Sequence, residues 1–213
     1  MYDIILFDFD GTIYDTLEGI TKCMQYALKK QGIEEELSQL SCFAGPPLAE
    51  KIPEMYGFDE EKTKEVIKDF RERYSPIGIY ESRVFPEIPK LLEDLRIAGK
   101  RLGIATSKPQ HLAEHLLEKE NIKDCFEVIC GSQPDGSLGK KDEVIRAVLE
   151  KFGVKNESVV LVGDTKYDVI GAHKCNLPCI GVRYGYAVPN ELEQAGAEII
   201  AEDSKELLKI LLS

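Results

Sequence analysis

The stretch Ile4-Ile5-Leu6-Phe7-Asp8-Phe9-Asp10-Gly11-Thr12-Ile13 decides how this chain folds and where its chemistry lies. Its first four residues are apolar and predict a buried β-strand. Two aspartates, one residue apart, follow that strand and lead into a Gly-Thr turn. Burying two carboxylates without a partner is costly or forces a proton onto one of them, and a cation removes this cost. Because an all-oxygen ligand set suits Mg²⁺, the stretch predicts a magnesium site at a strand end.

The composition of the 213 residues is that of a globular protein, with 43% apolar and 31% charged residues. The formal net charge is −11, from 38 acidic and 27 basic residues. This excess of acid, without a dense basic tract, argues against binding to a nucleic-acid backbone. A site for an anionic substrate must therefore be made locally positive by a metal, a lysine or backbone N–H groups.

The lack of a recognisable targeting signal and the spacing of the cysteines both predict a cytoplasmic protein. Asp3 and Asp8 interrupt the apolar N-terminal run, so we expect no signal peptide. No apolar stretch approaches the roughly 20 residues of a membrane span. The six cysteines form no CxxC pair and no zinc-finger spacing with histidine, which predicts reduced thiols. They are Cys23, Cys42, Cys125, Cys130, Cys175 and Cys179.

Short apolar runs alternate with segments of helical period along most of the chain. This alternation predicts βαβ units and hence an α/β fold, a Rossmann-like parallel sheet flanked by helices. The predicted strands are Ile4–Phe7, Leu102–Ala105, Phe126–Ile129, Val159–Val162, Cys179–Val182 and Ala197–Ile200. The predicted helices between and after them are Pro89–Ala98, Leu112–Glu120, Asp142–Phe152, Val169–Cys175 and Ser204–Leu212.

One interval, from about Thr16 to Val84, breaks the alternation and carries only helical pattern. Its predicted helices are Thr16–Gln31 (ended by Gly32), Leu48–Met55 and Glu60–Tyr74. About seventy residues are more than a crossover needs, so we expect a small all-helical module inserted after the first strand. The predicted core is 1–15 with 85–213, and the predicted cap is 16–84. Such a cap would lie over the carboxyl ends of the strands, where open α/β sheets bind ligands.

Four polar signals each follow a predicted strand or open the segment after one. They are Asp8-x-Asp10, Thr106-Ser107-Lys108, Lys140-Lys141 and Gly163-Asp164-Thr165-Lys166-Tyr167-Asp168. Each signal alone is weak, since an aspartate often caps a helix and a lysine pair is often solvated. Their shared place at strand ends favours a single site.

Together these signals resemble the haloacid dehalogenase superfamily of phosphohydrolases, whose pattern is DxDGT, a strand-end Thr or Ser, a Lys, and GDxxxD. Gly45-Pro46-Pro47-Leu48, Ala105–Pro109 and Gly163–Thr165 resemble its phosphoglycolate phosphatase and 5′-nucleotidase-like branches. The resemblance implies a Mg²⁺-dependent phosphomonoester hydrolase for a small phosphorylated metabolite, with 2-phosphoglycolate as first expectation. A 5′-nucleotidase, a pyrophosphatase, a sugar phosphatase and a sugar phosphomutase remain alternatives, and the protein could be a monomer or a homodimer.

The resemblance also implies roles for four aspartates. Asp8 would attack phosphorus and form an aspartyl-phosphate. Asp10 would protonate the leaving alcohol and later take a proton from water. Mg²⁺ would be held by Asp8, the backbone carbonyl of Asp10 and Asp164. Asp168 would orient the motif lysine or a metal-bound water.

Phosphate contacts are expected from the turn after the first strand, from the second motif and from a lysine. These residues are Gly11, Thr12, Thr106, Ser107 and Lys141. Thr106 and the lysine would stabilise charge in the transition state. Many relatives have a proline after this lysine, and neither Lys140 nor Lys141 does. We favour Lys141 because Lys-x-Glu-Val-Ile resembles the branch better, and Lys140 remains the alternative.

The inserted module supplies the candidates for selecting the substrate, which are Gly45, Pro46, Lys51 and Arg71. Lys51, Arg71 and Arg73 could provide positive charge, and the alternative is a solvated helix face. The Gly45-Pro46-Pro47 turn could close over a substrate, with hinges near Tyr14–Thr16 and Ser82–Phe85. Three histidines are expected on helix surfaces, and Tyr184 and Tyr186 are expected to pack or line a rim. The histidines are His111, His115 and His173.

Overall fold

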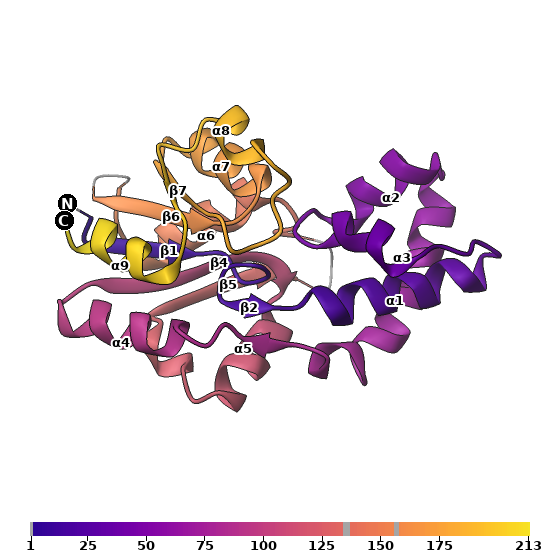
Figure 1. The fold of residues 1–213 in the computed structure, drawn as a ribbon, viewed down its shortest axis with the longest axis horizontal. Coiled ribbons are helices and arrows are strands. Elements are labelled where there is room, and N and C mark those ends of the chain that lie inside the picture. The colour runs from indigo at the N-terminus through magenta and orange to yellow at the C-terminus, as the bar shows by residue number, and fades with distance from the viewer. Residues whose placement is uncertain (1, 134–136, 156–157) are drawn as a thin grey trace. The chain divides into compact units, whose positions relative to one another are not determined.

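The computed structural model describes residues 2–133, 137–155 and 158–213 (Figure 1). The chain forms two compact units. The core unit consists of residues up to 14 together with 84–213, and the inserted unit consists of residues 15–83. Each unit has its own packing and is described by itself.

The core unit is built on a six-stranded sheet of order β5-β4-β1-β6-β7-β8, in which every neighbouring pair is parallel. This confirms the predicted α/β class. The strands are β1 (Ile4–Phe7), β4 (Arg101–Pro109), β5 (Val128–Ser132), β6 (Val159–Gly163), β7 (Cys179–Val182) and β8 (Ile199–Ala201). All four residues of β1 are buried, as a strand covered on both faces requires.

Helices cover both faces of this sheet (Figure 1). On one face, α6 (Lys141–Phe152) packs on β4 and β5, and α7 (Lys166–Lys174) packs on β6 and β7. On the other face, α5 (Gln110–Lys119) packs on β4 and β5, while α4 (Ile88–Ile97) packs against α9 (Ser204–Leu212). The short α8 (Glu191–Ala195) packs on α7, and η3 (Lys123–Cys125) is a single 3₁₀ turn.

The strand order places a topological switch point beside β1. From β1 the chain continues on one side through β4 to β5, and it then returns to the other side at β6. The connections that follow β1 and β6 therefore diverge at the carboxyl edge of the sheet. Open α/β sheets bind their ligands at such a point.

Several predicted boundaries shift in the structure. β4 continues beyond Ala105 through the polar residues to Pro109, with a change of register between the two. β5 begins at Val128 rather than Phe126, because Phe126 follows a 3₁₀ turn and packs edge-on against Phe7 at 6.4 Å between ring centroids. Helices α5, α6 and α7 begin one to three residues earlier than predicted, since their first residues are polar and carry no apolar period.

The inserted unit is helical, with α1 packed along α3. Its elements are α1 (Leu17–Lys30), η1 (Leu37–Phe43), α2 (Leu48–Tyr56), α3 (Glu60–Tyr74) and η2 (Gly78–Tyr80). Gly32 has φ +77°, the left-handed conformation expected just after a helix end. Two short strands that the sequence did not indicate, β2 (Tyr14–Asp15) and β3 (Arg83–Val84), pair where the chain passes between the units.

Candidate active site

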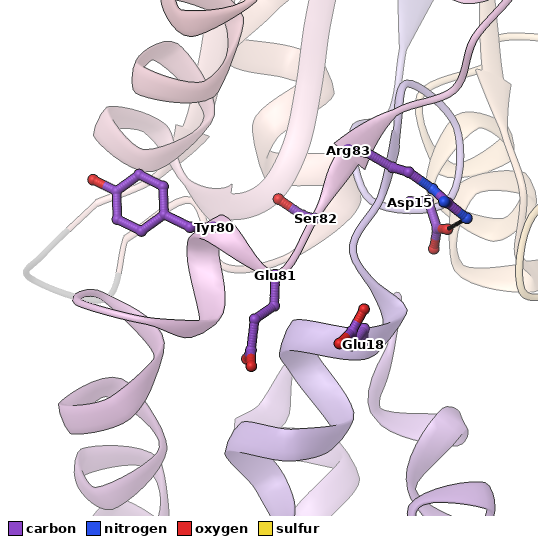
Figure 2. A pocket seen from close by; sticks show the side chains of 6 residues that line it. All are labelled: Asp15, Glu18, Tyr80, Glu81, Ser82 and Arg83. Carbon is purple, nitrogen blue, oxygen red and sulfur yellow. Dashed lines mark hydrogen bonds and ion pairs between the residues drawn. The ribbon is translucent and has the colours of Figure 1, made fainter.

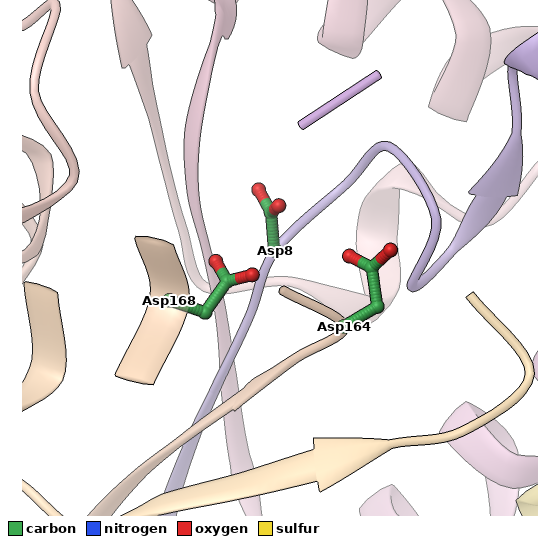
Figure 3. Close-up of side chains that lie close together, drawn as sticks. All are labelled: Asp8, Asp164 and Asp168. Carbon is green, nitrogen blue, oxygen red and sulfur yellow. The ribbon is translucent and has the colours of Figure 1, made fainter. Parts of the chain in front are cut away.

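Three carboxylates meet at the carboxyl edge of the core sheet (Figure 3). Asp8 follows β1, Asp164 follows β6, and Asp168 lies in the first turn of α7. One oxygen of each lies within 4.8 Å of the others, and all three residues are buried. The cluster thus lies at the switch point of the sheet.

The backbone around Asp8 is held firmly. The Asp8 N–H donates to the carbonyl of Val162 at 2.9 Å, which extends the pairing of β1 with β6. In the turn that follows, the carbonyl of Phe9 accepts from the N–H groups of Ile13 and Tyr14, both at 2.9 Å. Because strand and turn are both hydrogen-bonded, the two aspartates of the first motif project from a fixed backbone.

Lys141 brings a positive charge into the cluster. Its Nζ lies 2.5 Å from Asp8 Oδ1 and 2.9 Å from Asp168 Oδ1. The same Nζ donates to the carbonyl of Ala105 at 3.1 Å. The Lys141 side chain is only 6% exposed, whereas Lys140 is exposed at the start of α6. Of the two lysines left open by the sequence, Lys141 is the one that contacts the carboxylates.

Asp168 uses both of its carboxylate oxygens within the protein. Oδ1 faces Lys141, and Oδ2 accepts from the N–H and the hydroxyl of Thr165, both at 3.0 Å. These last two bonds also cap the start of α7. Asp168 is therefore arranged to hold the lysine.

Asp164 is held by two other segments of the core unit. Its Oδ2 accepts from the backbone N–H of Tyr186 at 2.8 Å. Its Oδ1 lies 3.3 Å from the hydroxyl of Thr12, which donates to it. A carboxylate has about four lone-pair positions, so these two bonds leave room for a further ligand.

Burial dominates the electrostatics of the cluster. Burial raises the pKa of Asp8 to about 7, with Asp168 and Asp10 adding to the rise and Lys141 opposing it. Burial also raises the pKa of Asp164, and the neighbouring carboxylates of Asp168 and Asp8 raise it further. Burial alone would lower the pKa of Lys141, but the two carboxylates beside it raise that pKa overall.

The cluster has the chemistry of a site for a divalent cation. Three buried carboxylates face one buried ammonium group, which leaves negative charge without compensation. The oxygens of Asp8 and Asp164 are hard ligands of the kind that Mg²⁺ prefers. The residues present therefore fit the ion that the sequence predicted.

Lys108 is a residue of this region that the sequence reading did not assign. Its Nζ lies 3.0 Å from Oδ1 of Asp10, and its side chain is only 3% exposed. It also lies over the ring of Phe9, 5.5 Å from the ring centroid. Next to it in β4, the hydroxyl of buried Thr106 accepts from the Lys108 N–H at 3.2 Å, and Ser107 is half-buried. Asp10 is therefore held by an ion pair with buried Lys108, on the strand that carries the second motif.

Two tyrosines do more than pack or line a rim. The hydroxyl of Tyr184 donates to the carbonyl of Thr12 at 3.1 Å, and Tyr186 binds Asp164 through its N–H. The sequence offered no signal for these contacts, because they join segments far apart along the chain. The three histidines are exposed on helices, as expected.

The residues that the sequence predicted to select the substrate all lie in the inserted unit. Gly45 and Pro46 form the turn before α2, and Arg71 is exposed on α3. Lys51 pairs with Glu54 at 2.8 Å. The sequence also offers Arg73 as a source of positive charge for a substrate. In the structure, both of its terminal nitrogens donate to the carboxylate of Glu81, at 2.8 and 3.1 Å.

The inserted unit also has a pocket of about 230 Å³ (Figure 2). Its lining residues are Asp15, Glu18, Tyr80, Glu81, Ser82 and Arg83. Within it, Arg83 Nη2 lies 3.2 Å from Asp15 Oδ2. The pocket contains none of the residues that the sequence singled out for chemistry.

The cysteines and the helices bear on the predictions of reduced thiols and of no membrane span. All six cysteines are free thiols. Among the described residues, no helix combines the length and apolar character needed to cross a bilayer.

Comparison with known proteins agrees with this geometry. A family model of haloacid dehalogenase-like hydrolases matches residues 5–182. A 5′-nucleotidase of Pseudomonas aeruginosa is 42% identical over 192 residues, which are 90% of this chain and 87% of that protein. The tyrosine-protein kinase PtkA of Mycobacterium tuberculosis is 34% identical over 198 residues, 92% of this chain and 67% of that protein. A phosphoglycolate phosphatase of Aquifex aeolicus is 27% identical over 191 residues, 88% of this chain and 87% of that protein.

A solved structure matches over the full length. The crystal structure of a predicted phosphatase from Clostridium acetobutylicum has a TM-score of 0.97 and 42% sequence identity, covering 100% of this chain and 99% of that one. The fold and the site together define an α/β enzyme of the phosphatase class. The chain belongs to the haloacid dehalogenase-like hydrolases, as its motifs indicated.

Proposed function

We propose that this phosphatase hydrolyses phosphomonoesters of small metabolites in a Mg²⁺-dependent reaction, through an aspartyl-phosphate formed on Asp8. The observation that carries the proposal is the position of Asp8, buried at the end of the central strand between Asp164 and Lys141. Carboxylates in this position can act as nucleophiles when nearby positive charge offsets the phosphate's own charge.

Asp8, the backbone carbonyl of Asp10 and Asp164 would hold the ion. Asp168 is the less suitable ligand, because both of its oxygens already have partners in the protein. When bound, Mg²⁺ would shield the phosphate so that an anionic nucleophile can approach it.

In the first half of the reaction, a carboxylate oxygen of Asp8 forms a bond to phosphorus while the ester P–O bond breaks. Asp10 gives its proton to the departing alkoxide, which leaves as the alcohol. The ammonium of Lys141 and the hydroxyl of Thr106 stabilise the charge on the phosphoryl oxygens. Lys108 donates to Oδ1 of Asp10 at 3.0 Å, which holds the carboxyl group in place and leaves Oδ2 to carry the proton.

In the second half, a water molecule attacks the phosphorus of the aspartyl-phosphate. Asp10, now a carboxylate, takes a proton from that water, and the bond between phosphorus and Asp8 breaks. Inorganic phosphate leaves, and both aspartates return to their starting states. The same pair of carboxylates thus serves both halves of the reaction.

Nucleoside 5′-monophosphates are the substrates that we place first. The relative named 5′-nucleotidase is 42% identical to this chain, whereas the relative named phosphoglycolate phosphatase is 27% identical. This reverses the order expected from motifs alone, in which 2-phosphoglycolate came first. The inserted unit would act as the cap, with Gly45, Pro46, Lys51 and Arg71 as candidates for selecting the ester.

Transfer of a phosphoryl group to a protein tyrosine is a second candidate function. It is favoured by the 34% identity with the relative named tyrosine-protein kinase PtkA. Asp8 would accept the γ-phosphoryl group of ATP, with ADP leaving. A tyrosine oxygen would then attack phosphorus in place of water, so that the bond between Asp8 and phosphorus breaks, with Asp10 taking the hydroxyl proton. Labelled ATP, followed by detection of label on tyrosine, separates this reaction from hydrolysis.

Phosphate release is the experiment that tests the proposal. Purified protein is incubated with nucleoside 5′-monophosphates, 2-phosphoglycolate, sugar phosphates and pyrophosphate, each with Mg²⁺ and with EDTA, beside Asp8→Asn. We expect Mg²⁺-dependent release that is fastest from a nucleoside 5′-monophosphate and absent in Asp8→Asn. Folded wild-type protein that releases phosphate from none of these esters would overturn the proposal, and activation by traces of a hexose bisphosphate would indicate a mutase.

A further inference from the structure

Two segments far apart in the sequence hold the carboxylate of Asp164 from different directions. One is the turn after β1, with Gly11 and Thr12. The other follows β7 and consists of Tyr184, Gly185 and Tyr186, and we name it the post-β7 loop. No motif of the sequence includes this loop.

The contacts of Asp164 form a closed ring. Its Oδ2 accepts from the N–H of Tyr186 at 2.8 Å, and its Oδ1 accepts from the hydroxyl of Thr12 at 3.3 Å. The ring is completed by the hydroxyl of Tyr184, which donates to the carbonyl of Thr12 at 3.1 Å. Each oxygen of Asp164 is thus held by one segment, and the two segments are bonded to each other.

Two glycines let these segments approach so closely. A Cβ atom on Gly185 would lie 2.2 Å from Cβ of Asp164 and 2.4 Å from its Oδ2. A Cβ atom on Gly11 would lie 2.1 Å from the same Oδ2. Since Cβ of Asp164 is attached directly to the backbone, a rotation of its side chain could not relieve the first clash.

We propose that the post-β7 loop is a positioning element of the metal site, and that Tyr184 and Gly185 set the affinity for the divalent cation. The inference rests on the metal site of the proposed function. Asp164 can turn about its side-chain bonds, and a ligand that is already oriented loses less freedom when it binds a metal. Residues that orient metal ligands commonly change metal affinity 10- to 100-fold when replaced.

If Tyr184 served only to pack the core, a different result would be expected. The ring of Tyr184 packs edge-on against Phe85, with 5.1 Å between centroids. Tyr184→Phe keeps that ring contact and removes only the hydroxyl that donates to Thr12. If the hydroxyl merely stabilised the fold, its loss would lower the melting temperature and leave the cation's dissociation constant unchanged.

The test measures the dissociation constant of Mg²⁺, and of Mn²⁺ as a second probe, by titration calorimetry on the full chain without substrate. Three variants are compared with the wild type: Tyr184→Phe, Gly185→Ala and the control Tyr26→Phe. The control removes a tyrosine hydroxyl that bonds to Glu72 in the inserted unit. Melting temperatures of all four proteins are recorded alongside.

We expect the dissociation constant to rise about 3- to 10-fold in Tyr184→Phe and more than about 10-fold in Gly185→Ala, with no change in Tyr26→Phe. If Gly185→Ala does not fold, Tyr184→Phe alone decides. A folded Tyr184→Phe that binds both cations as tightly as the wild type overturns this inference. A wild-type protein that binds neither cation overturns the metal site of the proposed function instead.

Discussion

Acidic side chains have opposite electrostatic surroundings in the two units. In the inserted unit, Glu81 is bound by both terminal nitrogens of Arg73 and by Lys22 at 3.3 Å, so its charge is matched. The hydrogen bond from Arg73 lowers the pKa of Glu81. In the core unit, burial raises the pKa values of Asp8 and Asp164, and Lys141 pairs with Asp8 and Asp168 but not with Asp164 among the three carboxylates.

The inserted unit thus has charges that are paired with one another, whereas the core unit has carboxylates that a bound cation could neutralise. A partly exposed pair such as Arg73 and Glu81 adds only modest stability, and its charges are already compensated. Surplus buried charge costs stability unless a ligand neutralises it, and that cost favours binding a cation.

Replacing Lys141 should have the largest effect. We expect Lys141→Met to lower kcat about 100- to 1,000-fold, because the phosphoryl oxygens and two buried carboxylates lose their only close ammonium among the described residues. The neighbouring variant Lys140→Met should stay within about twofold of the wild type. Steady-state kinetics on the best ester decide, and a larger loss in Lys140→Met than in Lys141→Met would show that the assignment is wrong.

Replacing Lys108 should have a smaller effect on the reaction. Lys108→Met removes an ion-pair partner of Asp10, so the carboxyl group that we propose as the proton donor loses a contact that orients it. We expect kcat to fall about tenfold and KM to change less. Lys90→Met, an exposed position on α4, is the control, and equal kcat values in the two variants would exclude a role for Lys108.

The raised pKa values of Asp8 and Asp164 should make the stabilisation of the protein by Mg²⁺ depend on pH. The folded, metal-free protein keeps protons on Asp8, with its pKa of about 7, and on Asp164 to higher pH than the unfolded chain. The stability that these raised pKa values contribute is therefore present at low pH and is lost as pH rises, for Asp8 as pH rises to about 7. Mg²⁺ competes with these protons, so its benefit grows with pH.

Melting temperatures with Mg²⁺ and with EDTA test this at about pH 5.5 and about pH 7.5. We expect the gain from Mg²⁺ to be larger by about 5 °C at the higher pH, and to be nearly absent in Asp164→Asn at both. A gain of equal size at the two pH values would contradict the link between these carboxylates and the metal.

Replacing Arg73 should have the smallest effect on activity. Arg73→Met should lower the free energy of unfolding by about 1 to 2 kcal/mol, because Glu81 loses the two hydrogen bonds that Arg73 donates to it. Turnover at saturating substrate should stay within about twofold. Denaturant unfolding beside Glu81→Gln and the double variant measures the coupling, and a loss of turnover without a loss of stability would move Arg73 into the chemistry.

The parts of the molecule that follow from periodicity could be predicted from the sequence. The apolar strands and their alternation with helices specify the parallel sheet, and a parallel sheet brings its strand ends to one edge. Asp8 and Asp164 stand directly after such strands, so their meeting at the cluster follows from the topology. The sequence favoured Lys141 and left Lys140 as the alternative, and the contacts of Lys141 with Asp8 and Asp168 are what the structure adds.

The remaining features depend on contacts that no local pattern reports. Lys108 lies in a polar strand end, and only the ion pair with Asp10 shows why it can be buried. Tyr184 and Gly185 follow a strand without any charged motif, and their partners stand near the other end of the chain. The hydrogen bonds and the close approach that give these residues a role belong to the tertiary structure, so no local sequence pattern indicates them.

The pairing of β2 with β3 has a consequence for how such a chain can diversify. The inserted unit begins and ends at neighbouring points, where Arg83 bonds to Asp15. A module whose two ends already lie together can be lengthened, shortened or exchanged without stretching the host sheet, and its loop-closure entropy changes only slowly with length. Replacement of the whole segment that lies between these two strands would therefore leave the six-stranded core sheet unchanged.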